Sequence, residues 1–297
     1  MYSVNDLETF IAVVENKGVL AAAREQKISP ATVSHRLSKL ERELSTVLVF
    51  RDSRRIRLSP AGELFYARVG GIIEALYDAE HEIGARSSSV SGLLRVTMPP
   101  WIFSKYVMPQ LSKFEQEYPQ LKLDFLISDQ FVNVVDNTQD VAIRVGKLND
   151  SALLSRKLVD NSRILCASPA YIKKRGMPKT LAELEEHSWV CLPWQQQLRV
   201  FDEHKNTQTL HANTRFTISN SDNMTQAALA GHGIAIKSLI AINDDLAQGR
   251  LVEVMPNVLA NSDAPVWFLR AQNALPMRKT EVFYTFMKSL LQSATQA

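Results

Sequence analysis

The stretch from Ser29 to Leu44 constrains the fold of this chain more than any other segment. A Ser-Pro pair starts a helix well, because serine accepts hydrogen bonds from free backbone amides and proline needs no amide partner in the first turn. At 100° per residue, apolar side chains then share one face, and small, polar or basic side chains occupy the other. The apolar face holds Val33, Leu37, Leu40 and Leu44, and the opposite face holds Ala31, Ser34, His35 and Ser38, flanked by Thr32, Arg36 and Lys39. Such an outer face is suited to the base edges in a nucleic-acid groove, although a surface helix without a partner remains the alternative.

Two shorter helices are expected before this one. The first shows the i, i+3, i+4, i+7 spacing of an amphipathic helix in Leu7, Phe10, Ile11 and Val14. Asn5 is expected to cap it, and a second helix is expected from Ala21 to Gln26. Short helices joined by a tight connection form a helix-turn-helix, in which the helix starting at Pro30 would enter the groove.

Positive charge is concentrated at the start of the chain. Residues 1–59 hold ten Lys and Arg against seven Asp and Glu, whereas residues 60–297 hold 24 of each. Strand-like runs at residues 47–50 and 56–58 flank a turn that carries most of four arginines, namely Arg51, Arg54, Arg55 and Arg57. Together with the preceding helices, this hairpin predicts a wing that binds phosphate groups. Taken alone, the cluster would suit a solvated surface turn equally well.

Ser59 and Pro60 start another helix, which is expected to reach about Arg86. Its apolar residues alternate in steps of four and three, the seam of a short coiled coil, and comprise Phe65, Val69, Ile72, Leu76, Ala79 and Ile83. We expect this seam to form a homodimer that presents two recognition helices to DNA. The alternative is that the stripe packs on its own chain.

Composition limits the remaining possibilities. The 297 residues are 45% hydrophobic and 22% charged, as expected for a globular protein, and they contain no apolar run long enough to span a membrane. The first residues lack the basic and then apolar pattern of a secretion signal, so a cytoplasmic location without membrane association is expected. Cys166 and Cys191 are expected to be small buried residues. No common phosphate-binding, hydrolase or metalloprotease motif occurs, so we expect no catalytic residues, no metal, no cofactor and no enzymatic activity.

A polar linker at residues 87–92 precedes a different pattern, in which short strands alternate with helices. Strands are expected at residues 93–97, 121–127, 141–145, 164–167, 214–218 and 233–236, with a helix from Ser104 to Tyr118. This order predicts parallel α/β units. Ligands of such folds bind beyond the carboxyl ends of strands, which here means after Thr97 and after Ser219.

Residues 7–62 resemble the amino-terminal domain of LysR-type transcriptional regulators. The motifs that carry the resemblance are Ala21-Ala22-Ala23-Arg24, Ile28-Ser29, Val33-Ser34-His35-Arg36-Leu37, Leu40-Glu41-x-Glu43-Leu44, Leu48-x-x-Arg51 and Leu58-Ser59-Pro60-Ala61-Gly62. Lys17-Gly18-Val19, Gln26 and Ser45 depart from the family pattern, which puts local packing in doubt. The runs Asp140–Gly146 and Cys166–Tyr171 resemble the effector domain of the same family, which is similar to periplasmic solute-binding folds.

The resemblance implies a winged helix-turn-helix domain at residues 1–59, a linker and dimerisation helix at 60–91, and a two-lobed α/β effector-binding domain at 92–297. Lobe I would hold residues 92–160 and 267–297, and lobe II residues 161–266. Candidate base contacts are Pro30, Ala31, Ser34 and His35, and candidate phosphate contacts are Thr32, Arg36, Arg51 and Arg54. Candidate effector-binding residues are Thr97, Pro99, Pro100, Trp101, Ser128, Arg144, Gly146, Phe201, Ser221 and Asn223.

Three residues allow two interpretations. Trp101 and Phe103 either narrow the effector pocket or pack inside their lobe. Lys237 either pairs with an anionic ligand or is a surface lysine whose stem lies along the protein.

The expected function is that of a regulator that binds double-stranded promoter DNA as a homodimer or, as is usual in the family, a homotetramer. A small-molecule effector would change its conformation. The alternative is a cytoplasmic small-molecule-binding protein or enzyme whose first sixty residues dock on another protein.

Overall fold

The computed structural model describes residues 1–52, 55–83, 90–130, 139–148, 153–271 and 277–296. The chain divides into two compact units, Met1–Ser89 with Asn273–Arg278, and Val90–Gln272 with Lys279–Ala297. Each unit is described by itself below. Among the described residues, no helix has both the length and the apolar character needed to cross a bilayer.

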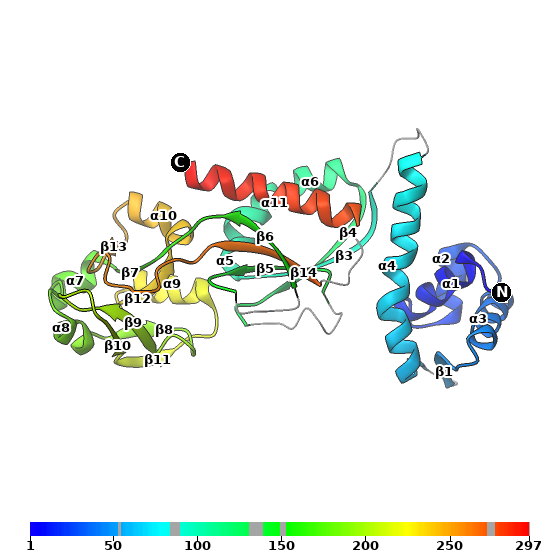
Figure 1. The fold of residues 1–297 in the computed structure, drawn as a ribbon, viewed down its shortest axis with the longest axis horizontal. Helices are drawn as coiled ribbons and strands as arrows, with labels where there is room; N and C mark the ends of the chain where they lie inside the picture. Colours follow the sequence, from blue (N-terminus) through cyan, green and yellow to red (C-terminus); the bar gives the residue numbers. More distant parts are fainter. Residues whose placement is uncertain (53–54, 84–89, 131–138, 149–152, 272–276, 297) are drawn as a thin grey trace. The chain divides into compact units, whose positions relative to one another are not determined.

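The first unit is built on three helices, α1 (Val4–Glu15), α2 (Val19–Gln26) and α3 (Pro30–Glu43), shown in Figure 1. Their apolar stripes meet in a core in which Phe10, Val33 and Leu37 are fully buried. The expected cap of α1 is wrong: Ser3, not Asn5, precedes the helix, and its backbone amide donates to the Asp6 carboxylate at 2.8 Å. Ser3 and Asp6 form a capping box, in which each residue satisfies a backbone amide of the other. The helix therefore begins at Val4, two residues earlier than a cap at Asn5 would allow.

The start and orientation of α3 are as expected. The Ser29 hydroxyl accepts a hydrogen bond from the Thr32 amide at 3.0 Å, and Pro30 occupies the first turn. Val33, Leu37 and Leu40 are fully buried, so the opposite face of the helix is turned away from the core of this unit.

Strands β1 (Val49–Asp52) and β2 (Arg55–Leu58) form the expected antiparallel wing, and α4 (Pro60–Ile83) follows it directly. The junction between wing and helix is tight. A Cβ atom added to Gly62 would lie 2.0 Å from the Leu48 carbonyl oxygen, so only glycine fits at this position. Ser59 reinforces the junction, because its amide donates to Leu48 O at 2.9 Å and its hydroxyl accepts from the Gly62 amide at 2.9 Å.

The expected seam of α4 is partly wrong. Val69 is buried in the core of its own chain, and the ring of Phe65 packs 5.6 Å from that of Phe10. Both residues therefore stabilise the first unit instead of lining a coiled coil, because this side of the helix covers α1. Among the α4 side chains that the structure describes, the large apolar ones that are exposed are Leu64, Ile72 and Leu76. The side chains of Ala79 and Ile83 lie outside the described residues.

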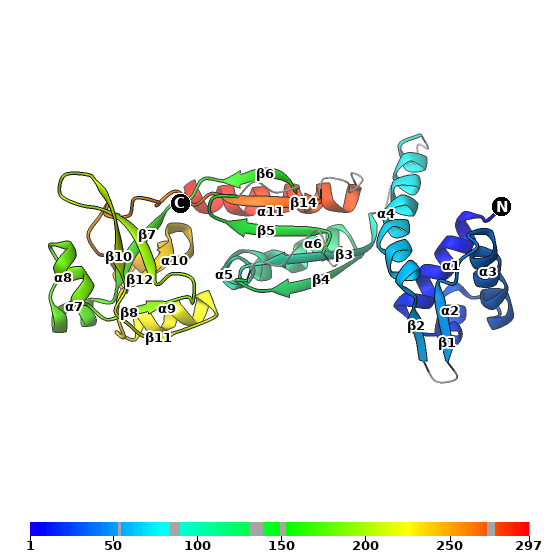
Figure 2. The same ribbon diagram turned by 60° about the horizontal axis from the view of Figure 1, so that its bottom comes forward.

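The second unit contains two lobes. Among the described residues, the sheet of the first lobe has the strand order β4-β3-β5-β14-β6, seen in Figure 2. Its strands are β3 (Ser91–Met98), β4 (Gln120–Ile127), β5 (Val141–Val145), β6 (Leu153–Val159) and β14 (Val266–Ala271). Helices α6 (Leu111–Glu117) and α11 (Arg278–Gln296) pack on this sheet through Phe114, Phe283 and Met287.

The second lobe holds small sheets surrounded by short helices. Its strands are β7 (Arg163–Ala167), β8 (Trp189–Cys191), β9 (Gln197–Phe201), β10 (Thr207–His211), β11 (Thr214–Thr217), β12 (Ala235–Ser238) and β13 (Val252–Glu253). Its helices are α7 (Pro169–Arg175), α8 (Leu181–Glu186), α9 (Ser221–Leu229) and α10 (Leu239–Ala247). Cys166 and Cys191 are fully buried in its cores, as expected.

Two expectations for this unit need correction. The sheet of the first lobe is mixed: β3 runs parallel to β4 and β5, whereas β14 runs antiparallel to β5 and β6, because the chain re-enters the first lobe from the second. The helix expected from Ser104 to Tyr118 is divided into a π-helical turn (Phe103–Val107), a 3-10 turn (Met108–Gln110) and α6, and the short helix α5 (Pro100–Ile102) precedes them. Pro109 explains the division, since it supplies no amide to the preceding turn.

Candidate functional site

The outer face of α3 is the candidate nucleic-acid interface. Pro30, Ala31 and His35 are exposed, and Ser34 is half-buried, so all four expected base-contacting residues can be reached from outside the first unit. The hydroxyl of Thr32 lies 2.7 Å from that of Ser29, which keeps it at the start of the helix. Their contact with bases stays a prediction.

Polar contacts on the flank of α3 fix its position against α1. The Arg36 guanidinium donates to Thr9 Oγ1 at 3.3 Å, and this hydroxyl also donates to Gln26 Oε1 at 3.0 Å. Gln26, which departs from the family pattern, therefore has a polar partner inside the unit. On the next turn, Lys39 pairs with the buried Asp6 at 3.0 Å. Burial alone would raise the pKa of the Asp6 carboxyl, but hydrogen bonds from Ser3 and Lys39 outweigh it and lower the pKa overall.

The wing is described only in part. The backbone of Arg51 lies in β1, opposite Ile56, but its side chain lies outside the described residues, as does the whole of Arg54. The expected phosphate contacts of these two arginines therefore remain predictions. Arg57 on β2 is exposed, and it adds a positive charge to the same hairpin.

The second unit brings three of the expected effector residues near one another. Thr97 is buried near the end of β3 and accepts a hydrogen bond from the Arg144 guanidinium at 3.1 Å. Ser221 begins α9 in the other lobe, and its amide donates to Asp129 Oδ2 at 2.6 Å. Burial lowers the pKa of Arg144, and the charge of Asp129, which follows Ser128, partly offsets this effect, so these groups belong to one electrostatic cluster.

Lys237 belongs to this cluster and is not a surface lysine. It lies in β12 with a side chain that is 3% exposed, and its ammonium donates to Ser221 O at 2.6 Å. Burial lowers the pKa of Lys237 to about 8, and burial likewise lowers the pKa of Arg144 to about 10. The sequence signal for a buried charge was the position of Lys237, which directly follows the apolar run Ile234-Ala235-Ile236 and precedes Leu239 and Ile240 by two and three residues. For Asp129, the only sequence feature that indicated a role in this cluster was its position after a strand.

Other expected effector residues lie elsewhere. Trp101 is a core side chain, with its ring 6.1 Å from that of Tyr106, and Phe103 packs 5.0 Å from Phe125. Both aromatic side chains therefore pack within their lobe, and the prediction that Trp101 binds the effector is wrong. Phe201 is exposed at the end of β9, and no contact described in the structure joins it to Arg144 or Ser221.

The remaining candidates have backbone roles. Pro99 precedes the short helix α5 and is buried with Pro100, so both shape the turn after β3. Gly146 has a φ of +118°, which favours glycine, and its carbonyl accepts a hydrogen bond from the Trp267 indole at 2.9 Å. The Asn223 amide donates to Asn220 Oδ1, and its side chain is exposed.

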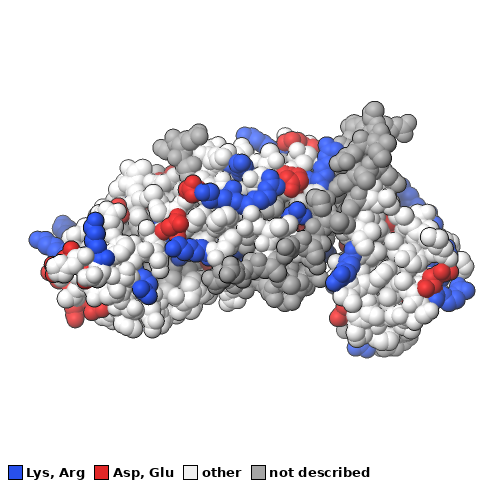
Figure 3. Space-filling model, in the orientation of Figure 1, with Lys and Arg blue, Asp and Glu red and all other residues white. Residues whose placement is uncertain are grey.

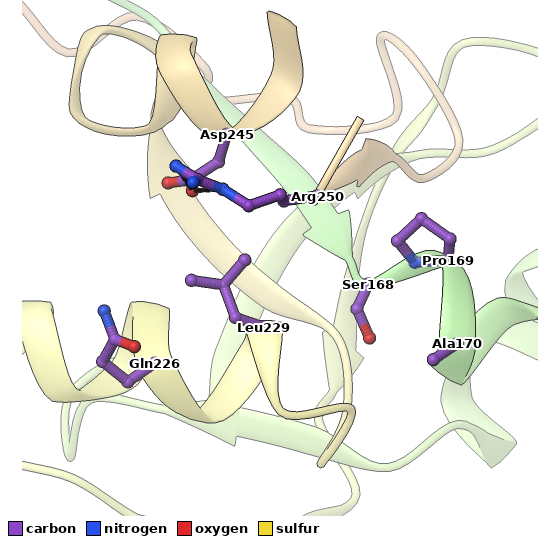
Figure 4. Close-up of a pocket in the computed structure, with 7 residues that line it drawn as sticks. All are labelled: Ser168, Pro169, Ala170, Gln226, Leu229, Asp245 and Arg250. Atoms are coloured by element: carbon purple, nitrogen blue, oxygen red, sulfur yellow. Dashed lines mark hydrogen bonds and ion pairs between the residues drawn. The ribbon is translucent and has the colours of Figure 1, made fainter. Parts of the chain in front are cut away.

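A pocket of about 760 Å³ lies apart from this cluster, in the second lobe (Figure 4). Its wall consists of Ser168, Pro169, Ala170, Gln226, Leu229, Asp245 and Arg250. The one guanidinium among these lining residues is already paired, because Arg250 lies 2.7 Å from the Asp245 carboxylate. No candidate effector residue belongs to this wall. Among the described residues, no group of three His, Cys, Asp or Glu is placed to hold a metal ion.

The balance of charged residues differs between the start of the chain and the rest. On the face of the second unit drawn in Figure 3, basic and acidic side chains are interspersed. This mixture agrees with the equal numbers of positive and negative residues after position 59. The positive excess of the sequence belongs to the segment that contains α3 and the wing.

Comparison with known proteins matches both parts of the chain. Residues 4–63 match the family described as "Bacterial regulatory helix-turn-helix protein, lysR family", and residues 87–292 match "LysR substrate binding domain". The HTH-type transcriptional regulator DmlR of Escherichia coli is 31% identical over 290 residues, covering 96% of this chain and 93% of DmlR.

Two solved regulators share the fold. CrgA from Neisseria meningitidis, a LysR-type transcriptional regulator, is 25% identical, with a TM-score of 0.60 over 99% of both chains. AphB, a virulence activator of Vibrio cholerae, is 26% identical, with a TM-score of 0.58 over 97% of this chain and 99% of its own. With the winged helix-turn-helix and the two-lobed α/β unit in place, the chain belongs to the LysR family and is a DNA-binding transcriptional regulator with an effector-binding domain.

Proposed function

We propose that this regulator binds double-stranded promoter DNA as a homodimer, with the outer face of α3 in the major groove. One observation supports this most strongly: the face with Ala31, Ser34 and His35 is accessible, while the opposite face is fully buried. Short side chains let the helix backbone approach base edges closely, and the hydroxyl and imidazole groups can donate or accept hydrogen bonds there. Pro30 contacts the bases from the first turn.

Phosphate contacts come from the flanks of this face. Thr32 lies beside the recognition face, while Arg36 is half-buried and keeps a contact with Thr9. Arg51 and Arg54 of the wing bind the neighbouring backbone. These contacts give affinity without sequence preference. They weaken as salt concentration rises, because the release of cations from the DNA on protein binding then contributes less free energy.

The dimer forms through the exposed side of α4. Leu64, Ile72 and Leu76 of this helix are 60%, 56% and 40% exposed, although all three are large apolar residues. Exposed leucine and isoleucine on a helix indicate a protein interface when they share a face. Two such dimers assemble into a homotetramer, as is usual in the family.

The effector binds between the two lobes of the second unit. Hydrogen bonds join the lobes at this place: Ser104 Oγ to Asp222 at 2.8 Å, and the Ser221 amide to Asp129 at 2.6 Å. A small molecule that prefers one arrangement of the lobes shifts the balance between DNA-bound states of the oligomer. The regulator acts in the cytoplasm by binding, without catalysis.

The test is a titration of fluorescently labelled duplexes with the full-length protein at several salt concentrations. Wild type is expected to bind duplexes that it selects from a random-sequence library, with an affinity that falls steeply as salt rises. Arg51→Ala with Arg54→Ala is expected to weaken binding to all duplexes alike and to reduce the salt slope by about one for each arginine. Lys122→Ala, an exposed residue of β4, is the matched control and is expected to bind as wild type. Binding that is absent, or insensitive to salt, would contradict the proposal.

A further inference from the structure

The amino end of α9 receives a carboxylate that it does not need as a cap. Asn220 already caps this helix, because its side-chain oxygen accepts from the Asp222 and Asn223 amides at 2.9 and 3.0 Å. The Ser221 amide instead donates to Asp129, which comes from the loop after β4 in the other lobe. A carboxylate from outside the lobe thus occupies the position that the free amides of a helix offer to an anion.

Two buried cations flank this carboxylate. Lys237 is 3% exposed, and its ammonium, which has three N–H donors, makes one hydrogen bond to a described residue, Ser221 O. Arg144 is 6% exposed, and its guanidinium donates to Thr97 Oγ1 and to its neighbour's carbonyl, Ile143 O. Neither cation is within ion-pair distance of a carboxylate among the described residues, although the charge of Asp129 acts on both.

A third donor at the same place is unused. Ser221 is 5% exposed, and its hydroxyl has no hydrogen-bond partner of normal geometry among the described residues. This hydroxyl nevertheless lies close enough to Asp129 to lower the pKa of that carboxyl, so it is directed at the same position. A buried polar group without a partner is rare in folded proteins and calls for a ligand or an ordered water.

Asp129 therefore satisfies this site incompletely. A carboxylate can accept about four hydrogen bonds, and this one accepts one from a described residue, the Ser221 amide. Burial raises the pKa of Asp129 overall, so the surroundings stabilise its charge less than water does.

We propose that Ser221, Lys237 and Arg144 form an anion-binding subsite, and that a carboxylate group of the effector displaces Asp129 from it. This inference rests on the proposed binding of an effector between the lobes. Exchange of one carboxylate for another leaves the charge of the buried cluster unchanged, whereas a neutral or cationic ligand in the place of Asp129 would remove the carboxylate whose charge acts on both buried cations. The effector is accordingly a small organic acid.

The exchange has a structural consequence. The hydrogen bond from the Ser221 amide to Asp129 joins the lobes, and a free ligand in the place of Asp129 breaks this connection. The lobes are then joined at this point through the ligand itself. Binding thereby alters how the lobes are held, which is what a regulator needs from its effector.

The proposal is tested in the full-length protein by removing the internal carboxylate and supplying an external one. Asp129→Ala leaves a vacancy the size of one carboxylate, and acetate is the probe. Unfolding of the second unit is followed by tryptophan fluorescence, because all four tryptophans, Trp101, Trp189, Trp194 and Trp267, lie in it. Ionic strength is held constant with chloride, and acetamide serves as the uncharged control.

Acetate is expected to raise the melting temperature of Asp129→Ala in a saturable manner, at a concentration about tenfold lower than wild type requires. Acetamide is expected to have no such effect, and Asp129→Ala combined with Lys237→Met is expected to lose the response to acetate. Asp129→Ser, which keeps an acceptor for the Ser221 amide, provides the same test if the alanine variant does not fold.

Three results would overturn the proposal: an equal response in wild type and variant, an equal response to acetamide, or a response that survives Lys237→Met. A rise that does not saturate would show an adventitious ion only, and would overturn it as well. DNA binding by wild type is measured separately, so failure of the anion subsite and failure of the proposed function are distinguishable.

Discussion

Gly62→Ala tests the structure against local helix propensity, because the structure predicts that the substitution destabilises the protein and helix propensity predicts that it stabilises it. In the middle of a helix, replacing glycine by alanine stabilises by about 1 kcal/mol. At Gly62, however, the new Cβ atom would lie 2.0 Å from Leu48 O and 2.9 Å from the Leu48 carbonyl carbon. Both atoms are backbone, so relief requires the wing strand and the start of α4 to separate.

The magnitude follows from what that separation breaks. Overpacking of this kind costs about 1–3 kcal/mol. The hydrogen bond from the Ser59 amide to Leu48 O, at 2.9 Å, would also weaken, at a cost of about 1 kcal/mol. After subtraction of the propensity gain, we expect a loss of about 2 kcal/mol in the stability of the first unit.

Hydrogen exchange measured by mass spectrometry is the suitable assay, because the first unit has no tryptophan. In the full-length protein, peptides from α3 are expected to exchange about 30-fold faster in Gly62→Ala than in wild type. Ala61→Gly, at the exposed neighbouring position, is the control and should cost at most about 1 kcal/mol. Slower exchange in Gly62→Ala than in wild type would refute the close approach of wing and helix.

Two further predictions concern the dimer helix and the buried lysine. Ile72→Asp is expected to raise the dimer dissociation constant by about 100-fold or more, because it places a charge in an apolar interface, whereas Met177→Asp, equally a change of an exposed apolar residue but in the second lobe, should leave sedimentation unchanged. A dimer that survives Ile72→Asp would show that this face of α4 is not the interface. Lys237 has a pKa of about 8 when folded, against an ordinary value of 10.5, so the unfolded chain binds more protons between these pH values and stability rises with pH across them. Lys237→Met is expected to abolish this rise in urea unfolding followed by tryptophan fluorescence; a slope that is retained would mean that other groups cause it.

Periodicity and capping in the sequence were sufficient to predict α3 and its orientation in the first unit. The Ser29-Pro30 start and the buried face of α3 follow from local chemistry and from a 100° repeat, both of which act within a few residues. The same reasoning misplaced Val69 and Phe65, since an apolar stripe on α4 does not say whether it covers the chain's own α1 or a second copy. Ser3 was missed as a cap because its partner, Asp6, is polar yet buried against Lys39.

The second unit shows where such reasoning stops. Individual strands such as β5 were found, but the antiparallel insertion of β14 between β5 and β6 depends on contacts over more than a hundred residues. The cluster at α9 joins Asp129, Arg144 and Lys237 from three strands or loops, and no spacing rule relates them. Trp101 was predicted to bind the effector because it follows the end of a strand, but its side chain packs against Tyr106 in the core.

The central claim is that the exposed face of α3 reads base edges, and its most direct test is a ratio of affinities. Full-length wild type and a Ser34→Ala/His35→Ala variant are titrated, at one salt concentration, with a selected duplex and with a scrambled duplex of equal length. Wild type is expected to prefer the selected duplex by about 1000-fold or more, and the variant to lose about 1–3 kcal/mol of this preference for each contact removed while it binds the scrambled duplex as before. A variant that discriminates as well as wild type would contradict the account.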